Sequence, residues 1–219
     1  MKGLAWFISI FFHPLFIATY LLLLILMVDP YLFGVNSIGE RKPLIFLVFF
    51  STAVIPAFGT FLIVRLGLAK SFVMDDKMDR TGPLIISGVF YLWVFWNLYS
   101  NPDMPRIFTT LMLGATIGLF LVFFFNIFFK ISAHMTGMGG WIGGVFLLVF
   151  FQKYQYLLLE WGEGMRLSIS LFSLLAISIV IAGLVASSRL WLKAHNFKEL
   201  GYGMVGGVAS QFMAYTILF

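Results

Sequence analysis

The polar segment 188–200 carries side chains whose types and spacing could do nucleophilic or acid–base chemistry. On a helix, Ser188, His195 and Glu199 would lie within roughly 40° of one another. Glu199 follows His195 by four residues, so its carboxylate can accept a hydrogen bond from the imidazole. That bond would leave the other ring nitrogen free as a nucleophile or base, and Arg189 offers a planar fork suited to phosphate oxygens. The alternative is a helix-end segment of solvated charges.

A second polar segment, 130–136, leads into a glycine-rich run. Ser132 and His134 place a hydroxyl and a titratable group just ahead of the glycines at 137, 139, 140, 143 and 144. A helix that begins here could bind an anion through its free N–H groups and its macrodipole. The glycines could instead allow close packing of helices, and we expect packing to be their main role. For His134 we expect a functional role, because the topology below places it on the same side as His195.

Acidic and basic residues alternate in a third polar segment, 75–83. Arg80 lies three residues before Pro83, which suits a helix start, and Arg80 is the best phosphate ligand of this segment. We expect Asp75 and Asp76 to form ion pairs at the membrane interface. Together with Asp79 they also raise the alternative of metal-dependent prenyl transfer, but the sequence has no second acidic cluster to complete such a site.

Long apolar runs separate these segments and must position them. Of the 219 residues, 61% are hydrophobic and 11% are charged, whereas soluble domains average about 25% charged residues. Lipid must therefore be the solvent. Cysteine is absent, which excludes disulfides, thiolate nucleophiles and cysteine-ligated metals. The formal charge of +5 reflects loop cations beside lipid headgroups and does not imply nucleic acid.

A spanning helix needs about 20 mostly apolar residues. The sequence predicts one all-α domain over 1–219, a polytopic membrane bundle of six to seven helices. Pro14 and Pro56 lie inside apolar runs and predict kinks. The predicted spans are 4–28, 43–65, 83–100, 105–128, 137–152, 167–187 and 201–218.

Seven spans would bring the segments 66–82, 129–136 and 188–200 to one face, because two spans separate each neighbouring pair. This face would be opposite the C-terminus. Nine cations on the N-terminal side, against five on the other, would make that side cytoplasmic by the positive-inside rule. Setting aside the four cations that could serve chemistry leaves five on each side, so the face of the site stays open.

The three segments, in this order, resemble the signatures of the type 2 phosphatidic acid phosphatase superfamily. Those signatures read approximately KxxxxxxRP, PSGH and SRxxxxxHxxxD. The third is matched closely by Ser188, Arg189 and His195, with Glu199 in place of the aspartate.

The other two signatures are degenerate. In the second, Ser132 and His134 are kept, while isoleucine replaces the proline and alanine replaces the glycine. In the first, two residues separate Arg80 from Pro83, and Lys77 or Lys70 would have to supply the lysine.

The resemblance implies a metal-independent lipid phosphatase without a cofactor, in a bundle of that superfamily. His195 would attack phosphorus and form a phosphohistidine, with Glu199 orienting it. His134 would protonate the leaving alkoxide and then help to activate water. The phosphoryl oxygens would be held by Arg80, Arg189, Lys77 and Ser132. The substrate would be a lipid phosphate: phosphatidate, phosphatidylglycerophosphate or a polyprenyl phosphate or diphosphate.

Two other functions remain open. The same cluster could bind an anionic lipid headgroup or a small anion in a transporter or channel, or the chain could be a non-catalytic scaffold of the same fold. The third histidine, His13, lies beside Pro14 inside the first run, and we expect it to form a structural hydrogen bond between helices. We expect an integral protein of a bacterial inner membrane.

Overall fold

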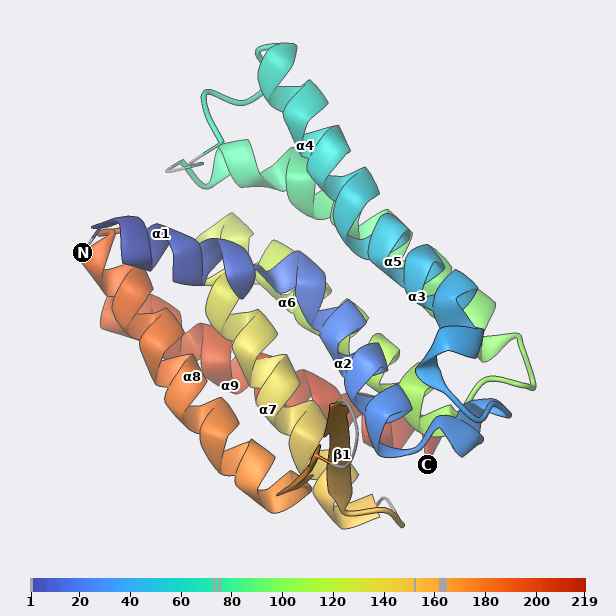
Figure 1. The fold of residues 1–219 in the computed structure, drawn as a ribbon. Helices are drawn as coiled ribbons and strands as arrows, with labels where there is room; N and C mark the ends of the chain where they lie inside the picture. The colour runs from blue at the N-terminus through green and yellow to red at the C-terminus, as the bar shows by residue number, and fades with distance from the viewer. Residues whose placement is uncertain (1, 73, 75, 152, 162–164) are drawn as a thin grey trace.

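The computed structural model describes residues 2–72, 74, 76–151, 153–161 and 165–219, and the described chain is mainly helical (Figure 1). The α-helices are α1 (Lys2–Phe11), α2 (Pro14–Val28), α3 (Lys42–Phe49), α4 (Ile55–Arg65), α5 (Thr81–Tyr99), α6 (Arg106–Phe128), α7 (Ala133–Phe151), α8 (Leu171–Trp191) and α9 (Phe197–Leu218). Short 3-10 turns cover Pro30–Phe33, Ile38–Arg41 and Met78–Arg80, and a π turn at Phe50–Val54 joins α3 to α4.

Within these described residues, five helical segments are long and apolar enough to cross a membrane, or six if the bent pair of α1 and α2 forms one span. This agrees with an integral membrane protein, and the upper count of six equals the lower limit of the predicted six to seven helices, although seven residue ranges were assigned as spans. The segment predicted as the seventh span forms α9, which packs along α6 and α7. It carries Lys198, Glu199 and Gln211 among its 22 residues, so its apolar content falls below that of the other long helices. The predicted span 137–152 corresponds to α7, which begins earlier, at Ala133, and is long and apolar enough to cross a membrane.

The first apolar run is broken between α1 and α2, which meet at an angle of 55°. Proline lacks a backbone N–H, and it disfavours helical geometry in the residue before it. Accordingly, His13 is extended, with φ −66° and ψ 137°, and its Nδ1 accepts a hydrogen bond of 3.4 Å from the backbone N–H of Leu15. The predicted kink at Pro14 is confirmed. Near Pro56 the irregularity is the π turn Phe50–Val54, which ends two residues before the proline.

A short antiparallel hairpin interrupts the otherwise all-α fold. Strands β1 (Tyr156–Trp161) and β2 (Met165–Ser170) pair between α7 and α8, in a region expected to be a polar break. The span predicted to start at 167 therefore starts at Leu171, where the side chain of Ser170 caps α8 by accepting a bond from Ser173 N.

Glycines let α7 and α9 pack closely, as expected from the sequence. A Cβ added to Gly203 of α9 would lie 2.6 Å from the carbonyl oxygen of Ser132, at the entrance to α7. A Cβ at Gly207 would collide with the backbone of Thr136, and one at Gly139 of α7 would collide with the backbone of Met204. Larger residues at these positions would force the helices apart, so these glycines serve packing.

The three polar segments lie at the same end of the bundle as the N-terminus, and the C-terminus lies at the other end (Figure 1). Hydrogen bonds join these segments directly. Arg80 Nη1 donates to the carbonyl of Ile131 (3.4 Å), and the N–H of Ser132 donates to the carbonyl of Glu199 (3.2 Å). The shared location predicted by counting crossings is therefore observed in the arrangement of the helices.

Candidate active site

His195 lies in the turn between α8 and α9 and is held by Glu199. The two side chains meet with 2.6 Å between His195 Nδ1 and Glu199 Oε2. Asn196, the N-cap of α9, donates from Nδ2 to the other carboxylate oxygen at 2.9 Å and accepts from the backbone N–H of Glu199 at 2.9 Å. Because both carboxylate oxygens are engaged, Glu199 is fixed, and the bond at Nδ1 leaves Nε2 of His195 as the nitrogen available for chemistry.

The surroundings of His195 favour the neutral imidazole. The pKa of His195 is lowered to about 4, chiefly because burial disfavours the charged form. Its hydrogen bond to Glu199 opposes this shift, while the charges of Arg80 and Arg189 add to it. His195 is therefore neutral near pH 7, with a lone pair on Nε2, which is the state that a nitrogen nucleophile requires.

Arg80 joins the loop before α5 to the loop before α7. Its Nε donates to the carbonyl of Met74 at 2.9 Å, and its Nη1 donates to the carbonyl of Ile131 at 3.4 Å. Both acceptors are backbone atoms, so these two bonds fix the orientation of the guanidinium between the two loops.

Arg189, at the C-terminal end of α8, is held by a hydroxyl group of α1. Its Nη1 donates to Ser9 Oγ at 3.3 Å, and Ser9 Oγ lies 3.2 Å from Ser188 Oγ. Since Ser188 donates its own proton to the carbonyl of Val185 (2.7 Å), Ser9 is the donor in the pair of hydroxyls. Arg189 Nε is buried and has no partner in the described part of the chain. Arg189 therefore keeps both charge and donor capacity for a ligand.

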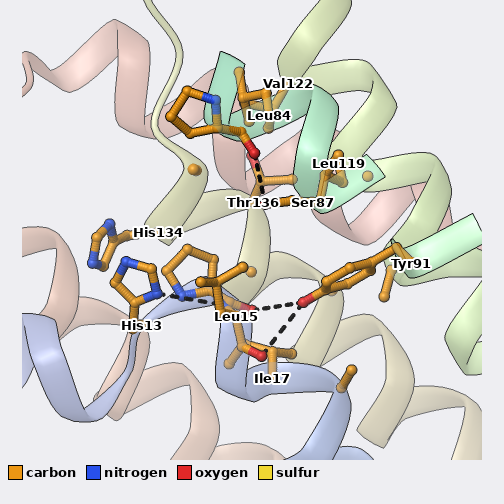
Figure 2. A pocket seen from close by; sticks show the side chains of 18 of the residues that line it. His13, Leu15, Ile17, Leu84, Ser87, Tyr91, Leu119, Val122, His134 and Thr136 are labelled. Carbon is orange, nitrogen blue, oxygen red and sulfur yellow. Dashed lines mark hydrogen bonds between the residues drawn. The ribbon is translucent and has the colours of Figure 1, made fainter. Parts of the chain in front are cut away.

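His134, in the first turn of α7, is oriented by the same serine. Its Nε2 lies 3.0 Å from the backbone carbonyl of Ser9, so this nitrogen carries the proton. The ring of His13 packs edge-on against it, with 5.2 Å between the ring centroids (Figure 2). α1 thus contributes to the surroundings of His134 and of Arg189.

One cavity of about 530 Å³ brings these groups together. Its polar wall includes Arg80, His134, Arg189 and His195, with Ser9 and His13 of the first broken run. The rest of the wall is mostly apolar and comes from other helices, for example Ile17, Leu84, Leu119 and Val122. Figure 2 shows the hydroxyl of Tyr91 reaching the backbone at the start of α2, where its acceptors are the carbonyls of Pro14 and Leu15.

The structure thus gathers Arg80, His134, Arg189 and His195 at one place, with Glu199 directly behind His195. Lys77 and Ser132 do not line the cavity. Lys77 Nζ donates to the carbonyl of Ile127 at 2.9 Å, at the C-terminal end of α6. The hydroxyl of Ser132 accepts from the N–H of Met135 at 3.4 Å, so both side chains have structural partners here.

Two residues of the site were not identified from the sequence. Asn196 had a signal, because an N-cap asparagine followed by glutamate three residues later is typical of a helix start. Ser9 precedes His13 by four residues, a spacing that places both on one helical face. Its three partners come from distant segments, so its role could not be inferred from that spacing.

The acidic segment before α5 contains an exposed ion pair. Asp76 Oδ2 lies 3.5 Å from Lys70 Nζ, and Asp76 Oδ1 accepts from the N–H of Met78 at 3.1 Å. The predicted ion pair is observed for Asp76, whereas Asp75 lies outside the described residues. Across the described chain, no group of three or more His, Asp or Glu side chains is placed to hold a metal ion.

Comparisons with protein-family models, with curated proteins and with solved structures find no match for this chain.

Proposed function

We propose that the protein is a membrane phosphatase that hydrolyses a lipid phosphate through a phosphohistidine. The observation that carries this proposal is the single cavity wall formed by His195, His134, Arg80 and Arg189. A neutral imidazole held by a carboxylate provides a nucleophile, and two guanidinium groups provide charge for the phosphoryl oxygens. Phosphoryl transfer depends mainly on such positioning and charge stabilisation.

The proposed first step is in-line attack by His195. Its Nε2 lone pair forms the P–N bond while the bond from phosphorus to the leaving oxygen breaks. Glu199 stabilises the positive charge that develops on the ring, because it is hydrogen-bonded to Nδ1. Because Nε2 of His134 is engaged by the carbonyl of Ser9, protonated His134 gives the proton on its Nδ1 to the leaving alkoxide, which departs as the lipid alcohol.

The second step releases phosphate. Neutral His134 takes a proton from a water molecule, whose oxygen attacks phosphorus as the P–N bond breaks. His195 regains its lone pair, and His134 is again protonated for the next cycle. Arg80 and Arg189 would neutralise the phosphoryl oxygens in both steps, and on this mechanism the chain's own cations supply the charge that a metal ion provides in other phosphatases.

The composition of the cavity wall supports a lipid substrate. The phosphate would lie at the polar end, and the hydrocarbon chain would lie along side chains such as Leu84, Leu119 and Val122. Phosphatidate, phosphatidylglycerophosphate and polyprenyl phosphates share this combination of an anionic head and an apolar tail.

A second candidate function is transport of an anionic lipid or small anion. The observation that favours it is the broken first run, which bends by 55° beside the cation cluster, because discontinuous helices commonly form ion sites in transporters. Transport requires binding without cleavage, so phosphate release separates it from hydrolysis.

The test is phosphate release by purified protein from detergent-dispersed lipid phosphates of these classes, with a colorimetric assay. We expect the wild type to release phosphate from at least one class and His195→Ala to release none above background. Lys198→Ala is the matched control, because Lys198 is exposed in the same segment and does not line the cavity. No release by wild type from any class, or equal release by His195→Ala, would refute the proposal. Flux of the same anions into liposomes would then test transport.

A further inference from the structure

His13 occupies a position that a purely structural histidine does not require. It lies at the break between α1 and α2, it is half-buried, and it lines the same cavity as His195 and Arg189. Its ring is 5.2 Å from the ring of His134, centroid to centroid, and the two stand side by side in Figure 2. The polar wall therefore contains three imidazoles from three separate segments of the chain.

The hydrogen bond at Nδ1 determines where a neutral His13 carries its proton. Nδ1 accepts from the backbone N–H of Leu15 at 3.4 Å, so this nitrogen must present a lone pair. The proton of the neutral ring is then on Nε2. No described residue accepts a hydrogen bond from that Nε2–H, which leaves it available to a ligand.

His134 differs in this respect. Its Nε2 is engaged with the carbonyl of Ser9 at 3.0 Å, so in this structure that N–H is not available for a ligand. Of the two adjacent imidazoles, both of which line the cavity, His13 is therefore the one whose Nε2–H is not committed to an acceptor among the described residues.

We propose that His13 is a phosphate ligand of this site, with its Nε2–H donating to a non-bridging phosphoryl oxygen of the bound lipid phosphate. This inference rests on the proposed function for the identity of the ligand. It adds a donor from the first run to the two arginines, and it makes the α1–α2 break part of the binding site. The hydrogen bond from the N–H of Leu15 to Nδ1 of His13, at the start of α2, fixes the imidazole ring and so holds its Nε2–H donor in place.

The competing role of His13 is capping of α2 alone, and substitutions can separate the two. Asparagine is among the best N-cap residues, but it is too short to keep a donor at the place of Nε2. His13→Asn therefore keeps the cap and removes the donor. His13→Gln and His13→Met form a second pair, since both have long, unbranched side chains and lose the cap, but only glutamine has an N–H donor.

The experiment measures binding of a phosphonate analogue of phosphatidate, in which a methylene group replaces the bridging oxygen, to purified protein in detergent. Thermal unfolding is measured in parallel. We expect His13→Asn to unfold at the wild-type temperature and to bind the phosphonate about tenfold more weakly, as expected for loss of one hydrogen bond to a charged acceptor. His13→Gln should bind several-fold more tightly than His13→Met.

Each result is decisive. Equal affinity of wild type and His13→Asn would overturn the inference. If His13→Asn does not fold, equal affinity of His13→Gln and His13→Met would overturn it instead. If wild type binds the phosphonate and His13→Asn binds it more weakly, yet wild type hydrolyses no lipid phosphate, the inference stands and the phosphatase proposal falls. If wild type fails to bind the phosphonate, the inference falls, and the phosphatase proposal is decided separately by phosphate release from the three classes of lipid phosphate.

Discussion

Replacing Glu199 with glutamine should reduce turnover and leave the fold intact. The carboxylate contacts His195 Nδ1 at 2.6 Å. When Nε2 bonds to phosphorus, the ring becomes positively charged, so its Nδ1–H donates to a carboxylate in the wild type and to a neutral amide in Glu199→Gln. Hydrogen bonds that involve a charged group contribute about 1.5–3 kcal/mol, and we expect the imidazolium–carboxylate pair near the upper end of this range and the imidazolium–amide bond near or below its lower end, because only the carboxylate adds an opposite charge. The difference of about 1–2 kcal/mol corresponds to a rate lower by about 5- to 30-fold.

The assay is the kcat for phosphate release at pH 7, with thermal unfolding as the check on folding. Glu199→Asp is the matched control, because it keeps the charge and shortens the side chain by one methylene. We expect Glu199→Asp to be faster than Glu199→Gln, and Glu199→Ala to be slowest, since alanine can neither orient nor stabilise the ring. A wild-type kcat for folded Glu199→Gln would refute the assigned role of the carboxylate.

Three further predictions follow from the same geometry. His195 should contribute a fall of about 3 kcal/mol in the free energy of unfolding between pH 6.5 and 4, and this contribution should then level off, because the unfolded chain protonates His195 near pH 6.5 whereas the folded pKa is about 4. The measurement is the difference between wild type and His195→Gln in chemical denaturation from pH 7 to below pH 4. Phosphate release should survive EDTA, and loss of activity that Mg²⁺ or Mn²⁺ restores would instead assign the acidic segment before α5 to metal binding. Single cysteines at the exposed positions Asp76, Phe129 and Asn196 should all react with an impermeant thiol reagent from one side of the membrane. A cysteine at the exposed position Asn36 should react from the other side. Reaction of Phe129→Cys and Asn196→Cys from opposite sides would contradict a shared site.

The pairing of His195 with Glu199 could be predicted from the sequence because it is local. Residues four apart on a helical turn are neighbours whatever the rest of the fold does, and the structure confirms the contact. The break at Pro14 could be predicted for the same reason, since a missing N–H and a steric clash with the preceding residue act within one turn. The apolar runs likewise indicated membrane helices, because the solvent of a helix follows from its own composition.

The sequence determined the boundaries of the helices and the number of spans less well. Hydropathy alone assigned residues 167–170 to the apolar run that follows them. In the structure these residues belong to β2, where they pair with β1, and Ser170 caps the start of α8. Similarly, α9 has the length of a span but is less apolar than the other long helices, and its glycines pack against α7.

The composition of the site was decided by tertiary structure. Lys77 has a residue type that suits phosphate, but the end of α6 lies close enough for its ammonium to bond to the carbonyl of Ile127. Ser9 is one serine in an apolar run, yet it contacts Ser188, Arg189 and His134, which are at least 125 positions away in the chain. Sequence alone determined which groups could react and which neighbours they meet within a helical turn. Contacts between distant segments depend on how the helices pack around the break at His13, and no local pattern encodes that packing.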